Sequence, residues 1–290
     1  MSTIYLETWL SSRKFKLTPD LIAPVPTGPF FLRGSVLSSA SYSANALAPG
    51  EPVTIFGRNL GPGTLAVASP NGGVYPTQFS GTPVLFDNVA APIIYTSAGA
   101  VSAIVPFSVV PQTRSNVVVE YQGAQSPPVS IYVFGSAPAL FTSDSSGAGP
   151  AAVLNYDPLT GAVSVNSPQN PVPRGGIIIA YMTGGGQTVP SSSDGVLATS
   201  AGQLALPIEA AFNFQVPSFG FSTSSCEAAE AVYNCQPLQV LYAGPAPGLV
   251  NGVTQVNLLV PNSASWSGTR DLGISVDGVW SQWHATVSIQ

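Results

Sequence analysis

The sequence predicts an all-β protein made of two tandem immunoglobulin-like β-sandwiches with an extended N-terminal arm. Length is the first reason: 290 residues, at about 100–200 residues per domain, suggest two domains. Composition is the second, because 29 glycines and 28 prolines indicate many short elements separated by turns. The third is an internal repeat, in which the second half of the chain follows the strand and turn pattern of the first.

The chain divides into three predicted parts. Residues 1–34 form the arm or linker, 35–137 the first immunoglobulin-like domain, and 138–290 the second, which carries an insertion near 218–236. Prolines interrupt the arm and leave room for no more than a short helical turn between Leu6 and Phe15. The apolar side chains of the arm favour packing along an open sheet edge, either of the same chain or of a neighbour, with simple disorder upstream of a missing domain as the alternative.

Short β-branched and aromatic runs, each bounded by Gly, Pro, Asn or Ser, predict the strands in order. In the first domain they lie at 53–56, 84–86, 93–95, 103–105, 116–121 and 129–134. Such strands with turn signals every 8–12 residues or so are typical of a sandwich or barrel. No segment has sustained helical periodicity.

The repeat aligns three stretches. Residues 47–55 (LAPGEPVTI) correspond to 172–179 (VPRGGIII), and both are a turn that enters an apolar strand. The pair of strands within 91–106 corresponds to the pair within 238–261, and in each copy a strand ending in Tyr is followed by one ending in Val-Pro. Residues 117–123 (VVVEYQG) correspond to 272–278 (LGISVDG), an alternating strand closed by a turn glycine.

These segments resemble the Solibacter uncharacterized C-terminal domain, a two-repeat domain of large secreted acidobacterial proteins, and more broadly the IPT/TIG immunoglobulin-like class. The matching stretches, which span about residues 36–290, are 48–62 (APGEPVTIFGRNLGP), 137–141 (APALF), 183–186 (TGGG), 242–248 (YAGPAPG) and 255–261 (QVNLLVP). The resemblance implies a fold and an extracellular location. It implies no chemistry, because the family has no established activity.

Two departures from the family pattern stand out. The first repeat has Ala100-Val101-Ser102 where the family has Gln-Ile-Asn, and the insertion with Cys226 and Cys235 is outside the usual pattern. The close spacing of the two cysteines in a turn-rich chain with few lysines predicts a local disulfide. Two free thiols are the alternative.

Composition excludes several classes of function. Only 7% of the residues are charged and the net charge is −5, so the clustered cations that nucleic-acid binding requires are missing. No apolar stretch is long enough for a transmembrane helix. The first residues do not read as a signal peptide, since Glu7 interrupts the apolar part. We therefore expect the natural export start to lie elsewhere, or the chain to be a piece of a longer protein.

We expect no catalytic site, cofactor or metal. His284 is placed in the last predicted strand, and no nucleophile elbow accompanies it. Most acids stand beside turn residues, as in Asp144, Asp157, Asp194 and Asp277, where turn formation explains them. The glycine-rich loop at 183–188 lacks the lysine and the following helix of a phosphate loop.

Aromatic residues are the remaining functional signal. Trp266, Trp280 and Trp283 crowd the last repeat, and Tyr233 lies in the insertion. Exposed aromatics stack on sugar rings and are enriched in protein interfaces, whereas buried ones belong to the core. Trp280 and Trp283 are three positions apart, so a regular strand would place them on opposite faces.

Two functions are therefore expected. The first is a non-enzymatic extracellular or cell-surface module for adhesion, spacing or assembly, with a protein or polysaccharide partner and with oligomers possible through the arm. The second is a carbohydrate-binding accessory module of secreted polysaccharide-degrading machinery. Buried or interfacial aromatics favour the first, and coplanar exposed aromatics favour the second.

Overall fold

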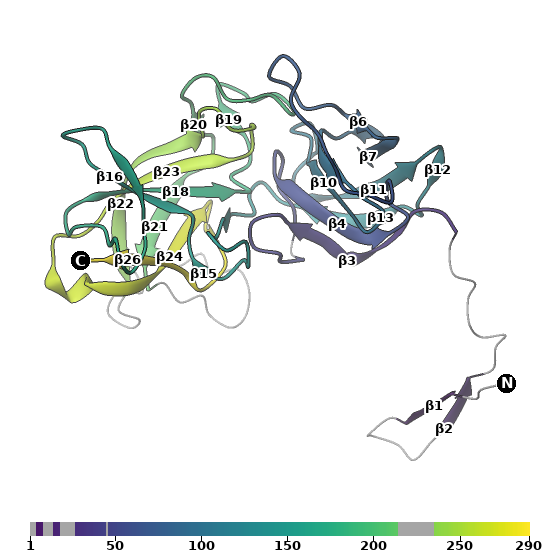
Figure 1. Ribbon diagram of the computed structural model, residues 1–290, viewed down its shortest axis with the longest axis horizontal. Coiled ribbons are helices and arrows are strands. Elements are labelled where there is room, and N and C mark those ends of the chain that lie inside the picture. Colours follow the sequence, from purple (N-terminus) through teal and green to yellow (C-terminus); the bar gives the residue numbers. More distant parts are fainter. Residues whose placement is uncertain (1–3, 8–13, 18–26, 45, 214–234) are drawn as a thin grey trace.

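The computed structural model describes residues 4–7, 14–17, 27–44, 46–213 and 235–290. The described chain is all-β, with several sheets and a single 3-10 turn at Ala264–Trp266. No helix in this part of the chain is long and apolar enough to cross a membrane. Figure 1 shows two bodies side by side, which we call the first half (residues 30–134) and the second half (residues 139–290).

The first half contains two sheets. One has the strand order β3-β4-β10-β9-β5, and the other has the order β12-β11-β7-β6 with β13 on β11 and β8 on β7. Their bounds are β3 (Phe30–Ser38), β4 (Pro52–Arg58), β5 (Ala66–Val67), β6 (Gln78–Phe79), β7 (Thr82–Phe86), β8 (Val89–Ala90), β9 (Ile93–Thr96), β10 (Ala100–Ile104), β11 (Thr113–Tyr121), β12 (Ala124–Gln125) and β13 (Val129–Val133).

The first core lies between these two sheets. Val53 and Ile55 of β4 belong to the same buried cluster as Val84 and Phe86 of β7. The intervening residue on β7, Leu85, is only partly buried, as the two-residue period of a strand requires. Each such side chain contributes about 1.5–3 kcal/mol when it is fully buried.

The second half is built around one eleven-stranded sheet that curls on itself, with the order β15-β26-β24-β21-β22-β23-β18-β16-β17, β14 on β18 and β25 on β24. A small β19-β20 sheet lies beside it. The bounds are β14 (Ala139–Leu140), β15 (Gly149–Pro150), β16 (Val153–Tyr156), β17 (Val163–Val165), β18 (Ile177–Thr183), β19 (Thr188–Val189), β20 (Gln203–Leu204), β21 (Ile208–Phe212), β22 (Gln236–Pro245), β23 (Thr254–Leu259), β24 (Gly268–Val276), β25 (Val279–Trp280) and β26 (Ala285–Ile289).

The second core lies inside this curled sheet. It joins Met182 of β18 and Leu258 of β23 to Leu272 and Ile274 of β24. The strands predicted within the three aligned stretches are all present. They are β4, β9, β10 and β11 in the first half and β18, β22, β23 and β24 in the second.

Strand pairing repeats between the halves. In the first half β4 pairs with β10 and β10 with β9, and in the second half β18 pairs with β23 and β23 with β22. The flanking strands follow the same rule, because β7-β11-β13 and β21-β24-β26 are both antiparallel triplets. Parallel bridges from Leu47 to Val133 and from Val172 to Ile289 also correspond. The sequence repeat is therefore a repeat of strand pairing.

The arm departs from expectation in two ways. Leu6 and Phe15, the limits of the predicted helical turn, face each other in an antiparallel pair of strands, β1 (Ile4–Glu7) and β2 (Lys14–Leu17). Polar and apolar residues alternate in β2 (KFKL), which favours strand over helix. The second difference is that β3 begins at Phe30 and Phe31 is buried in the first core. The last residues assigned to the arm thus belong to the folded first half.

Hydrogen bonds cross directly between the halves. The Asp194 carboxylate accepts from the Phe107 N–H at 2.7 Å, and the Gln187 amide donates to the Phe107 carbonyl at 2.6 Å. Main-chain bonds join Tyr75 to Gly195 and Leu197 to Gly73. These contacts fix the two halves against each other and define the junction at which the pocket lies.

Candidate functional site

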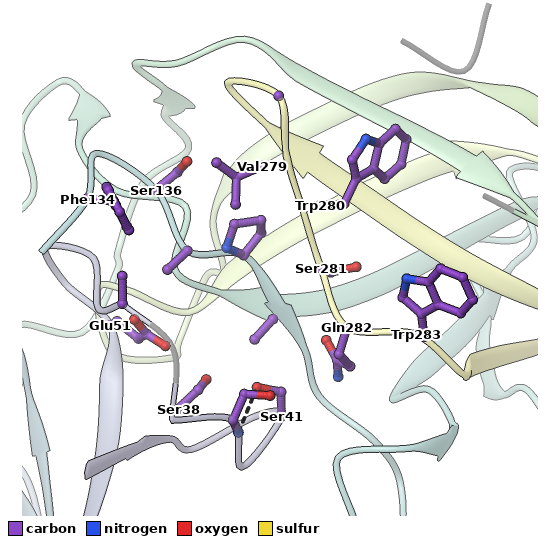
Figure 2. Close-up of a pocket in the computed structure, with 16 residues that line it drawn as sticks. Ser38, Ser41, Glu51, Phe134, Ser136, Val279, Trp280, Ser281, Gln282 and Trp283 are labelled. Carbon is purple, nitrogen blue, oxygen red and sulfur yellow. Dashed lines mark hydrogen bonds between the residues drawn. The ribbon is translucent and has the colours of Figure 1, made fainter. Parts of the chain in front are cut away.

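A pocket of about 440 Å³ opens at the junction of the two halves. This volume falls within the range of about 300–1,000 Å³ that is typical of small-ligand sites. The first half contributes Ser38, Ser41, Ser43, Ala46, Glu51 and Phe134, and the connection between the halves contributes residues 136–138. The second half contributes Ala139 and residues 278–283. Figure 2 shows Glu51 and Ser38 on one side of the pocket and the segment from Val279 to Trp283 on the other.

Glu51 is the chemically distinctive residue of this pocket. It follows the Pro49-Gly50 turn that enters β4, where Gly50 adopts a φ of 78°. One carboxylate oxygen, Oε2, accepts from the Ala48 N–H at 2.9 Å, while Oε1 is buried without a hydrogen-bond partner. The residue is only 1% exposed, and no ion pair of Glu51 is found in the described part of the chain.

Burial changes the protonation of this carboxyl group. Removal from water raises the pKa of Glu51 to about 8, although the Ala48 N–H and the Ser38 hydroxyl both favour the charged form. Desolvation dominates because a buried carboxylate without a cation loses its hydration. At neutral pH the group is therefore mostly a neutral carboxylic acid, which can donate as well as accept a hydrogen bond.

The fold itself does not require an acid at this position. In the second half Gly176 occupies the equivalent place, since its N–H donates to Pro173 and its carbonyl accepts from Val260. Glu51 makes the same two main-chain bonds, to Ala48 and from Val105. The turn is thus formed without a carboxyl group in one copy and with a buried carboxyl group in the other.

Several serine hydroxyls line the same pocket as the Glu51 carboxyl group. Ser38, Ser41 and Ser281 each accept from a main-chain N–H, of Ala40, Ser43 and Ile274 respectively. An accepting hydroxyl keeps its own proton for donation to another group. Ser136 differs, because it already donates to the Val276 carbonyl at 2.8 Å.

Gln282 holds in place the side of the pocket formed by residues 278–283. Its side-chain oxygen accepts from the Leu140 N–H at 2.9 Å, and its amide nitrogen donates to the Leu140 carbonyl at 2.6 Å. Through this pair of bonds the Gln282 side chain imitates the main-chain hydrogen bonds that a neighbouring strand would make to Leu140 of β14. It therefore fixes the segment that carries the two neighbouring tryptophans.

Trp280 and Trp283 both line this pocket, and Figure 2 shows their indole rings on the same side of the view, apart from each other. The condition for opposite faces, a regular strand through both residues, is not met, because β25 ends at Trp280 and strand alternation does not continue to Trp283. Trp283 is 42% exposed and Trp280 is half-buried. Trp266 lies elsewhere: it is buried in the second core, 6.3 Å from the Phe212 ring.

Two predicted site residues, Tyr233 and Cys226, lie outside the described residues. Cys235 is buried and packs with Ala211, with Trp280 against them. The disulfide between Cys226 and Cys235 therefore stays a prediction.

The acids expected in turns take several roles. Asp144 accepts from the Ser146 hydroxyl and N–H, and Asp157 accepts from the Thr160 hydroxyl and the Leu159 N–H. This is turn chemistry, and these bonds lower the pKa of each carboxyl. Asp194 instead bridges the halves through Phe107. Within the described ranges no group of three His, Cys, Asp or Glu residues is placed to hold a metal ion.

His284 is a turn residue with a φ of 63°, and β26 begins only after it. The strand position predicted for it was therefore wrong by one residue. Its Nδ1 lies 3.6 Å from Asp271, and its side chain is mostly exposed. No serine or cysteine nucleophile is hydrogen-bonded to it among the described residues.

Sequence reasoning missed Glu51 as a site residue. The residue was read only as part of a turn motif, although an acid directly before the buried run of β4 is a signal of its own. Whether such an acid turns outward or inward depends on the opposite half of the molecule, which the local sequence does not contain.

Comparison with known proteins gives no family. No family model matches the chain, and no curated protein matches it. Among solved structures, the γ-cyclodextrin glucanotransferase from Alkalophilic bacillus clarkii aligns at 12% identity with a TM-score of 0.26. The alignment covers 95% of this chain and 29% of that one. Likeness at this level supports no argument about function.

Proposed function

We propose that this chain is a non-enzymatic extracellular or cell-surface module for adhesion, spacing or assembly, built as two tandem immunoglobulin-like sandwiches of IPT/TIG type. The repeated strand pairing and the two separate cores support this architecture. The low charge and the resemblance to a domain of secreted proteins support the location.

The observation that carries the proposal is the pair of side chains that hold Phe107 across the junction, which we call the clamp. Asp194 and Gln187 hold both main-chain polar groups of one residue in the other half. A spacer or adhesion module transmits position and force only when its parts keep a fixed orientation. Direct bonds at the junction, in place of a flexible linker alone, provide that stiffness.

Adhesion is tested with the full chain coupled to beads. We expect beads that carry the chain to bind bacterial cells or to cluster with one another, and beads that carry serum albumin to do neither. Turnover of chromogenic esters or glycosides by the purified chain would contradict the non-enzymatic part. Failure to bind cells, sugars or itself would contradict adhesion and leave only a spacer.

A second candidate is a carbohydrate-binding accessory module. The observation that favours it is the junction pocket, in which two indole rings and several hydroxyls come together. Sugar sites combine apolar ring contacts with hydrogen bonds. A pull-down on insoluble cellulose, xylan and chitin tests this candidate, since a carbohydrate-binding module must be retained on a polysaccharide, whereas an adhesion or spacer module with a protein partner need not be.

A further inference from the structure

The Glu51 carboxyl oxygen without a partner is the starting point. A buried acceptor left without a hydrogen bond costs about 1–3 kcal/mol, yet Gly176 shows that the turn forms without any carboxyl group. Packing of the turn therefore does not account for Glu51. Its Oε1 has almost no exposed surface, but Glu51 lines the pocket, so a molecule that enters the pocket and displaces the neighbouring lining side chains reaches the carboxyl group.

The chemistry of the lining restricts what that group belongs to. The described lining contains no Lys, Arg or His, and Glu51 is its only acid. An anion would find no cation there. A metal ion would find a single carboxyl group and neutral hydroxyls, a poor set for Ca²⁺ or Mg²⁺. A neutral molecule fits best, because it can bind beside the Glu51 carboxyl group while that group stays protonated and uncharged.

The neutral molecule must also offer several hydroxyls and an apolar side. Ser41 and Ser281 keep protons to donate, the Ser38 hydroxyl interacts with the carboxyl group, and that carboxyl group both donates and accepts. Val279 and Ala139 supply apolar contact beside them. Sugar rings carry exchangeable hydroxyls at their rim and C–H groups on their faces, which matches this alternation.

We propose that the junction pocket binds one neutral sugar unit, which hydrogen-bonds to Glu51 and the surrounding serine hydroxyls. This inference rests on the second of the proposed functions and gives it a site. Because the lining comes from both halves, the bound sugar bridges them.

The test uses the full chain and a panel of soluble probes: glucose, galactose, mannose, N-acetylglucosamine, cellohexaose and xylohexaose. Binding is followed by saturation-transfer NMR and calorimetry at pH 6.5. The variants are Glu51→Ala, Glu51→Gln and Ser43→Trp, which fills the pocket. Glu120→Gln on β11 is the matched control, because Glu120 is outside the pocket and bonded only to Gln125 among the described side chains. Circular dichroism confirms that each variant is folded.

We expect at least one probe to bind the parent chain and Glu120→Gln equally. Loss of the carboxyl group in Glu51→Ala should weaken binding about tenfold or more, as expected for an unpaired hydrogen bond. Glu51→Gln keeps a donor and should bind within about threefold of the parent chain. Ser43→Trp should abolish binding.

The pH profile is a further readout. Binding to the parent chain should weaken as the pH rises through about 8, because the ionised Glu51 no longer donates, and binding to Glu51→Gln should not. No other titratable group lines the described pocket. The charged groups next to its surroundings are Asp194, bonded to Phe107 beside the Gly50 turn, and Asp277, which precedes Gly278 of the lining.

Three outcomes overturn the proposal, and they differ in what they leave standing. If a sugar binds but Glu51→Ala and Ser43→Trp bind like the parent chain, the site is wrong and carbohydrate binding survives. If no soluble probe binds but polysaccharide is retained in the pull-down, the same conclusion holds. If neither occurs, a trapped water satisfies Glu51 and the carbohydrate function fails with the site.

Discussion

Ser126 and Ser281 occupy equivalent positions in the two halves of the molecule. Each hydroxyl accepts from the main-chain N–H of the residue seven positions earlier, Val119 or Ile274, at 3.1 Å. The main-chain N–H of each serine returns a bond to the carbonyl of the same residue. In each half a hairpin lies between the serine and its partner. The hairpins are closed by Gln122-Gly123 and by Asp277-Gly278, and all four of these residues have a positive φ.

We expect Ser126→Ala and Ser281→Ala to destabilise the protein to a similar extent. Either change leaves a buried N–H without an acceptor, which costs about 1–3 kcal/mol. Urea unfolding of the two variants measures this. Only Ser281 lines the pocket, so sugar binding should fall in Ser281→Ala and persist in Ser126→Ala. Unchanged stability in both would contradict the equivalence.

Stability should depend on pH through Glu51. Its pKa in the folded protein is about 8, above the ordinary value of 4.5, so the folded state retains a proton that the unfolded state has lost. Stability is therefore greatest below about pH 4.5 for this group and declines until the pH passes about 8, by roughly a few kcal/mol. Urea unfolding from pH 5 to 9 measures the decline, which Glu51→Gln should remove. An equal slope in both proteins would contradict the burial of an ionisable carboxyl group.

The junction between the halves should loosen in Asp194→Ala. The lost charge-assisted bond to Phe107 is worth about 1.5–3 kcal/mol. We expect the single unfolding transition in calorimetry to split or broaden, and small-angle scattering to show a wider range of shapes. Asp157→Ala is the control, because Asp157 bonds only within its own turn. The same broadening in both variants would count against a specific clamp.

Cys226 and Cys235 should form a disulfide in protein exported to an oxidising compartment. Titration of the unfolded, unreduced chain with a thiol reagent should detect no free thiol. Two titratable thiols under those conditions would refute the bridge. Because Cys235 packs with Ala211 and Trp280, reduction should alter tryptophan fluorescence more than the circular dichroism of the strands.

The role of the arm is tested by truncation. Phe31 belongs to the first core, so the shortened chain should start at residue 27 and keep β3 intact. If the arm packs on a neighbouring molecule, light scattering should show oligomers for the full chain and monomers for the shortened one. If both the full chain and the shortened chain are monomeric at high concentration, assembly through the arm is excluded and packing of the arm on its own chain remains.

The sequence by itself determined the elements and their repetition. Strands such as β4 and β11 follow from β-branched runs closed by glycine and proline turns, which are local signals. The beginning of β3 at Phe30 was missed because the prolines just before it mask an edge strand. His284 was assigned to a strand because its neighbours are apolar, although its positive φ places it in a turn.

Only the tertiary structure decided the candidate site. Trp280 and Trp283 share a pocket because β25 stops between them, an event set by the turn and by the Gln282 contact with Leu140. Glu51 is buried, and it shares a pocket with residues 278–283 from the opposite end of the chain. A local pattern specifies the preferred backbone of a few residues. Desolvation and the pKa of a carboxyl group depend on what packs around it, which the fold alone brings together.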